Sequence, residues 1–196
     1  MPNNHVDKPF LTYEQMLELL ESRNVLIVNH DFAKGLLASV SYYTLINGYK
    51  HMFSFDKNNR FDPPVLFEDF HILHQFIFEL SNFLLKNIIN IENSLKSHLS
   101  YIVSKNYGVE TDLEDSHRLG DTDYLAKVHY RNSSLSGGIL NAIREQALKS
   151  KNVSLIHYRN NHNHIPCRIL VNGIPFGLSI EWYRILKAID KQYICN

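Results

Sequence analysis

The sequence has little cysteine, and its two cysteines are poorly spaced for binding a metal or for cross-linking. Cys167 and Cys195 are the only two in 196 residues. This number is too small for a disulfide scaffold, and the spacing matches no zinc motif. We therefore expect reduced thiols and no cofactor.

Long apolar runs are also missing. The longest are as short as Ile88-Ile89 and Ile169-Leu170-Val171, whereas a membrane-spanning helix needs roughly 20 residues. The first residues, MPNNHVDKPF, lack the apolar core of a signal peptide. With 44% hydrophobic and 20% charged residues, we expect a cytoplasmic, soluble protein without a membrane segment, folded as a single domain over residues 1–196.

Net charge is absent as well, but the charges are unevenly spread. Residues 110–123 hold six acidic side chains and one arginine, whereas residues 127–191 hold ten lysines and arginines against three acids. A basic final third indicates an anionic partner, and RNA is the first candidate. The alternative is that these charges are scattered over solvated helix faces and bind nothing.

Alternating strand patterns are absent, and helical periodicity dominates instead. Apolar residues recur every three or four positions from Phe70 to Ile102, and no glycine or proline interrupts residues 65–107. Gly108 then follows as a helix stop. The pattern predicts one long helix over about residues 67–107, which must pack along its length in an all-α helical bundle.

Shorter elements surround this helix. Thr12 and Gln15 form a capping box for a first helix, and Asp31 is the expected cap of a second helix, with an apolar face from Phe32 to Tyr43. Residues 25–28 read as a connector and residues 110–123 as a loop. A further helix is expected at residues 134–150, and two short ones flank Pro166 and Pro175.

Four short pieces, in this order, resemble the Abi-like family of bacterial abortive-infection proteins (the AbiD/AbiF type). They are KPFLTYEQ with LLESR at residues 8–23, ASVSYYTLINGY at residues 38–49, IENSLK with YG at residues 91–108, and IP with PFG at residues 165–177. Each piece is weak alone, but their order and spacing extend over nearly the whole chain.

The resemblance implies a function and a fold. It implies a phage-defence protein that acts on RNA, with a HEPN-type helical domain, which is often a metal-independent endoribonuclease and a homodimer. Family members usually continue into a helix with the pattern RN-x-x-x-H, and this chain ends at Asn196, about where that helix begins. Two residues also depart from the pattern: Lys96 replaces an arginine and Arg168 replaces a tryptophan.

The stretch HYRNNHNHIP at residues 157–166 contains the required spacing. Arg159-Asn160 is followed by His164. An arginine can hold the scissile phosphate, and a histidine can move a proton to or from ribose oxygens. We therefore predict that Arg159 and His164 are catalytic, and that Asn160, Lys96 and Arg168 bind RNA.

Three other interpretations of these residues stay open. The stretch is a polar connector before Pro166, in which case replacing Arg159 or His164 leaves stability unchanged. Alternatively, His157, His162 and His164 bind a metal with Cys167, although the spacing fits no standard zinc site. Finally, the protein is a non-catalytic RNA- or protein-binding module of the same family. Tyr42, Tyr43 and Tyr49 are expected in the core rather than stacked on RNA bases.

Overall fold

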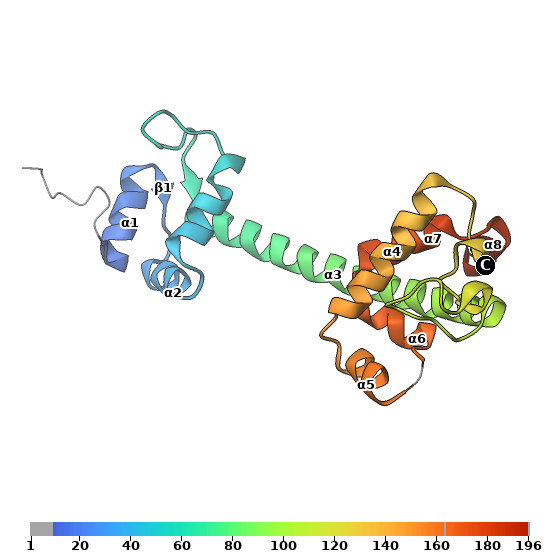
Figure 1. The fold of residues 1–196 in the computed structure, drawn as a ribbon. Coiled ribbons are helices and arrows are strands. Elements are labelled where there is room, and N and C mark those ends of the chain that lie inside the picture. Colours follow the sequence, from blue (N-terminus) through green and yellow to red (C-terminus); the bar gives the residue numbers. More distant parts are fainter. Residues whose placement is uncertain (1–9, 163, 196) are drawn as a thin grey trace, which may run out of the picture. The chain divides into compact units, whose positions relative to one another are not determined.

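The chain forms helices joined by loops and turns, with two very short strands (Figure 1). The structure is a computed structural model that describes residues 10–162 and 164–195. Its α-helices are α1 (Tyr13–Ser22), α2 (His30–Val40), α3 (Phe67–Tyr107), α4 (Ser134–Lys149), α5 (Val153–Asn161), α6 (Cys167–Leu170), α7 (Phe176–Ile185) and α8 (Ala188–Cys195). A π-helix covers Tyr43–Asn47, and 3-10 turns cover Lys50–Met52, Gly120–Thr122, Lys127–His129 and Val171–Gly173. The all-α prediction is confirmed.

The long helix is also confirmed, with the predicted bounds. α3 runs without a break from Phe67 to Tyr107. Gly108 ends it in the left-handed region, with φ of 93°, and donates its backbone N–H to the Ser104 carbonyl. A glycine adopts this backbone conformation without steric penalty, which explains why the helix stops there.

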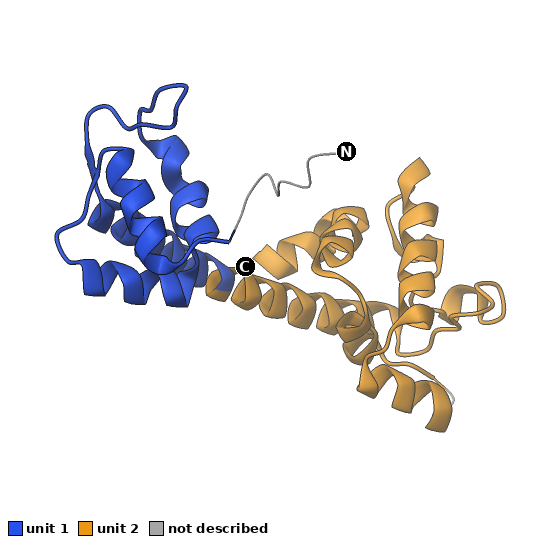
Figure 2. Ribbon diagram, turned by 90° about the vertical axis from the view of Figure 1, so that its left-hand side faces the viewer, with its two compact units in different colours: residues 1–85 blue, residues 86–196 orange. Residues whose placement is uncertain are grey.

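The chain divides into two compact units, residues 1–85 and residues 86–196 (Figure 2). The first part of α3 belongs to the first unit and the rest belongs to the second. The prediction of a single domain stays a prediction. One continuous helix, α3, runs from the first unit into the second. Among the described residues, no helix is both long and apolar enough to cross a membrane.

The first unit packs α1, α2 and the start of α3 around buried leucines and phenylalanines, including Leu20, Leu37, Leu45, Phe67 and Phe70. The capping box of α1 is present: Thr12 and Gln15 each donate a backbone N–H to the other's side chain. Lys8 and Pro9, from the first family-like piece, lie outside the described residues.

Three local predictions for the first unit were wrong. The cap of α2 is Asn29, whose side chain accepts the Phe32 N–H at 3.0 Å, so that Asp31 lies in the first turn near the positive helix end. Residues 25–28 are more than a connector, because β1 (Val25–Leu26) pairs in parallel with β2 (Val65–Leu66). Tyr43 is 77% exposed rather than in the core.

The second unit is built around the end of α3, with α4 packed against α7. Its center holds a chain of buried aromatic hydrogen bonds: Trp182 donates to the Tyr130 hydroxyl at 3.0 Å, and Tyr130 donates to the Tyr124 carbonyl at 2.8 Å. Tyr124 in turn donates to the Ile165 carbonyl at 2.8 Å. These bonds hold Ile165, the residue before Pro166, against the core. The predicted helices at residues 134–150 and after both prolines are confirmed.

Candidate functional site

The stretch HYRNNHNHIP is partly helical. Asn152 caps α5 by accepting the Leu155 N–H at 3.2 Å, and the helix then continues through Asn161 and ends at His162. Arg159 and Asn160 therefore lie on a helix, whereas His164 follows it. The expectation of a polar connector was wrong for the first half of the stretch, since the cap at Asn152 outweighs the low helix propensity of its asparagines.

Arg159 and His164 line the same small cavity. We call it the histidine cavity; its volume is about 170 Å³. Its walls come from residues 111–118, from the end of α4, and from α5 with the segment after it. The lining residues with polar side chains are Thr111, Asp112, Glu114, Arg118, Arg159, His162 and His164. The fold thus brings the predicted pair together and adds a second arginine and a second histidine.

Arg159 also closes the end of α4. Its guanidinium donates to the Leu148 carbonyl and, at 3.4 Å, to the Ser150 carbonyl. The last carbonyls of a helix have no partner within the helix, so these bonds satisfy groups that otherwise depend on water. The arginine is therefore held in place and has further N–H groups free of these two bonds. The expectation that its replacement leaves stability unchanged does not agree with this geometry.

The acidic side of the histidine cavity is centred on Asp112. Its carboxylate accepts the backbone N–H groups of Asp115 and Glu114, both at 2.9 Å, and pairs with the Arg118 guanidinium. The Asp115 N–H, together with that of Glu114 and with Arg118, holds the pKa of Asp112 below its usual value. The cavity therefore contains a carboxylate that stays ionised and a guanidinium that is largely exposed.

A metal centre of the kind considered above does not fit this arrangement. Cys167 is fully buried, and burial raises the pKa of its thiol far above the usual value, whereas a metal ligand must be a thiolate. In the part of the chain that is described, no group of three or more histidine, cysteine or acidic side chains is arranged to hold a metal.

The predicted RNA-binding residues lie apart from the histidine cavity. The Lys96 amine pairs with Glu92 at 2.7 Å and donates to the Ile174 carbonyl at 3.0 Å, and its side chain is 12% exposed. Asn160 and Arg168 are exposed, on α5 and α6, and neither lines the cavity. Lys96 is thus engaged within its own unit, while the other two side chains face solvent.

Sequence reasoning missed a buried ion pair next to this cavity. Arg144 of α4 pairs with Asp123 at 2.9 Å, and their side chains are 7% and 0% exposed. Arg144 also donates to the Asp112 carbonyl at 3.2 Å. The acidic loop and the basic final third, treated in the sequence as opposing surface charges, meet here inside the protein.

A family model described as Abi-like protein matches residues 35–196. This range includes three of the four pieces noted in the sequence, all except the one at residues 8–23. No curated protein and no solved structure matches the chain.

Proposed function

The chain belongs to the Abi-like protein family, and from this premise we propose that it acts in abortive infection by cleaving RNA, as a HEPN-type endoribonuclease that needs no metal. The observation that carries the proposal is that Arg159 and His164 line one cavity. An arginine held by backbone carbonyls beside a histidine is the pair of groups that this reaction requires.

The chemistry is transfer of the phosphate to the neighbouring ribose oxygen. His164 takes the proton from the 2′ hydroxyl, whose oxygen attacks phosphorus and forms the new P–O bond. The bond to the 5′ oxygen breaks, and that oxygen takes up a proton, for which His162 lines the same cavity. Arg159 stabilises the charge on the phosphate. The products are a 2′,3′-cyclic phosphate and a 5′ hydroxyl.

We propose that the working form is a homodimer, as in HEPN proteins generally. In the second unit, the side chains of Ile88, Ile89 and Ile91 on α3 are 46–60% exposed. Adjacent exposed apolar side chains on one helix are typical of an interaction surface, and a second copy is the simplest cover. Sedimentation equilibrium is expected to give twice the mass of the chain, and the mass of a monomer is expected after Ile88→Asp with Ile91→Asp.

The alternative is a non-catalytic RNA- or protein-binding module of the same family. One observation favours it: Arg159 donates hydrogen bonds to carbonyls at the end of α4. This structural role explains why an arginine is present here even if the protein catalyses no reaction. In this case the basic final third binds RNA through phosphates, and log affinity falls linearly with log salt concentration.

One experiment separates the two. The purified protein is incubated with end-labelled single-stranded RNA in EDTA, and both binding and the chemistry of the new ends are measured. We expect cleavage with 2′,3′-cyclic phosphate or 3′-phosphate ends. Binding that weakens with salt but gives no cleavage would establish the binding module. The absence of both binding and cleavage would show that the protein does not act on RNA.

A further inference from the structure

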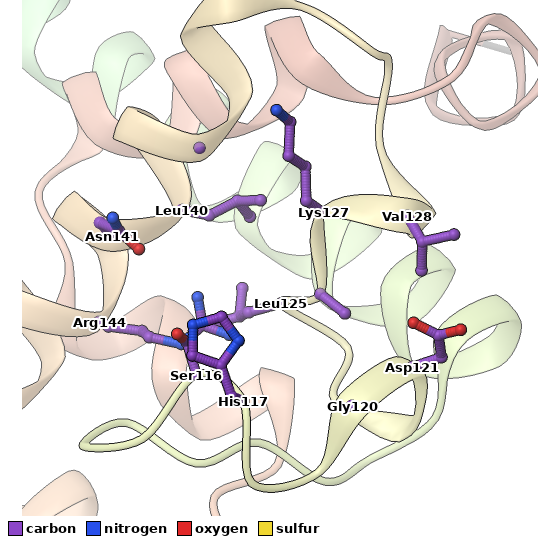
Figure 3. A pocket seen from close by; sticks show the side chains of 12 residues that line it. Ser116, His117, Gly120, Asp121, Leu125, Lys127, Val128, Leu140, Asn141 and Arg144 are labelled. Atoms are coloured by element: carbon purple, nitrogen blue, oxygen red, sulfur yellow. The ribbon is translucent and has the colours of Figure 1, made fainter.

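A second, larger cavity lies beside α4 (Figure 3). We call it the α4 cavity; its volume is about 410 Å³. It shares no lining residue with the histidine cavity. One wall is a face of α4, formed by Gly137, Leu140, Asn141 and Arg144 at helical spacing, and the other walls come from residues 116–128. Its volume is in the range of small-ligand sites.

Arg144 gives this cavity a rigid donor. Its Nε donates to the Asp112 carbonyl and its Nη2 pairs with the buried Asp123 carboxylate, so the guanidinium cannot swing away. Nη1 makes no hydrogen bond within the described residues. This nitrogen is the one that can donate to a ligand, and a held guanidinium suits a phosphate.

Two further nitrogen-containing side chains at the cavity have no partner among the described residues. Within the part of the chain that the structure describes, neither the Lys127 amine nor the His117 ring takes part in a hydrogen bond or ion pair. The Asn141 amide, which both donates and accepts, is also without a partner there. The Asn141 amide and the His117 ring lie on the same side of the cavity as Arg144 (Figure 3), so that they can donate to the same ligand group.

The rest of the lining argues against a bare anion. In the view of Figure 3, Arg144, Asn141, Ser116 and His117 lie toward one side of the cavity, and the Asp121 carboxylate lies toward the other. Leu125 and Leu140 lie between them. An ionised carboxylate repels phosphate but accepts hydrogen bonds from hydroxyl or amine groups. The apolar part between the two ends suits a flat ring.

We propose that the α4 cavity binds a nucleoside monophosphate unit. The phosphate lies against Arg144, on the side of the cavity where Asn141 and His117 also lie (Figure 3). The ring packs on the leucines, and Asp121 accepts from a ribose hydroxyl or a base N–H. This site is separate from the proposed cleavage site, and its test does not depend on RNA cleavage. Its ligand is either a free mononucleotide or one nucleotide of an RNA strand, which share this chemistry.

Two neighbouring glycines allow a matched test. A Cβ atom added at Gly137 or at Gly138 meets no atom within 4 Å, and of the two only Gly137 lines the cavity. Gly137→Leu therefore fills the site without removing any polar group, and Gly138→Leu is the control. Leucine favours helix more than glycine does, so neither change should lower the thermal midpoint.

The measurement is calorimetric titration of wild type and both variants with AMP, GMP, CMP and UMP. We expect at least one to bind wild type and Gly138→Leu equally, and to bind Gly137→Leu at least about tenfold more weakly. Asn141→Ala should weaken binding of that mononucleotide but not of its nucleoside. No binding of any of the four at millimolar concentration, or equal binding by the two leucine variants, would overturn the proposal.

Repeating the titration with a single-stranded RNA oligonucleotide identifies the source of the ligand. If Gly137→Leu weakens RNA binding too, the site holds a nucleotide of the strand. If RNA binds both variants equally while the mononucleotide does not, the ligand is a free nucleotide. A failure of the proposed cleavage reaction leaves both results readable, because neither requires turnover.

Discussion

The two cavities of the second unit differ in how far their polar side chains are already engaged. In the histidine cavity, Arg159 is bonded to backbone carbonyls and Arg118 to Asp112. In the α4 cavity, Lys127 and His117 have no partner among the described residues, and Arg144 alone is held. A substitution of either arginine in the first cavity therefore changes the fold and any chemistry together. In the second cavity, the two effects can be separated.

The largest effect on stability is expected at Arg144. This residue lines the α4 cavity and donates to the carbonyl of Asp112, which lines the histidine cavity. Arg144→Met keeps most of the side-chain volume but leaves the Asp123 carboxylate buried without its cation. Removing one partner of a buried ion pair typically costs about 3–5 kcal/mol. We expect a loss of this size in the free energy of unfolding, measured by urea denaturation.

Lys149 provides the control for this prediction. It forms an exposed ion pair with Glu145 one helical turn away on the same helix, and such pairs contribute about 0.3–0.5 kcal/mol. Lys149→Met should therefore leave stability almost unchanged. Equal losses for the two variants would mean that the Arg144–Asp123 pair is not a buried contact in solution.

A smaller loss is expected at Arg159. Arg159→Ala leaves the Leu148 and Ser150 carbonyls at the end of α4 without this donor. For a half-buried, charged donor we expect about 1.5 kcal/mol, or a thermal midpoint lower by about 3–6 °C for a chain of this size. Arg168→Ala, at an exposed position, should change it little. A midpoint for Arg159→Ala equal to that of Arg168→Ala would show that the helix end does not depend on Arg159.

The smallest effect concerns Asp112 and depends on pH. Because its pKa is lowered in the folded state, it contributes stability above its unfolded pKa of about 3.9, and this contribution is lost as pH falls through the lower folded value. Asp112→Asn should therefore reduce the thermal midpoint at pH 7 and have a smaller effect at pH 3. Glu114→Gln, an exposed neighbour, should show no such difference. An Asp112→Asn effect that is equal at both pH values would contradict the assignment.

The long elements of the fold could be predicted from sequence because their signals are local. The uninterrupted apolar periodicity gave α3 its bounds, and Gly108 gave its end. The β1–β2 pair could not be predicted, because it joins two residues at each of two sites that are far apart in the chain. The cap of α2 was placed two residues late, since Asn29 and Asp31 are both good caps and only the backbone decides between them.

The two central residues of the candidate site could be predicted from the sequence, but the residues that surround them could not. The spacing of Arg159 and His164 drew attention to residues that line one cavity. The surrounding groups come from other segments, and no local sequence pattern predicts them. They are the carbonyls that bind Arg159, the carboxylate of Asp112 and the ion pair of Arg144. The α4 cavity was missed for the same reason, although the glycine pair at residues 137–138, near the start of the predicted helix, was a signal of open space.

The proposed catalytic role of His164 is tested most directly by replacing this residue. Single-turnover cleavage of a labelled single-stranded RNA in EDTA is measured for wild type, His164→Ala and His157→Ala. His157 lies on α5 outside the histidine cavity and serves as the control. We predict that His164→Ala is slower by about 10²–10⁴-fold, the usual loss of general acid–base catalysis, and that His157→Ala cleaves as wild type does. Cleavage by His164→Ala at the wild-type rate would contradict the account.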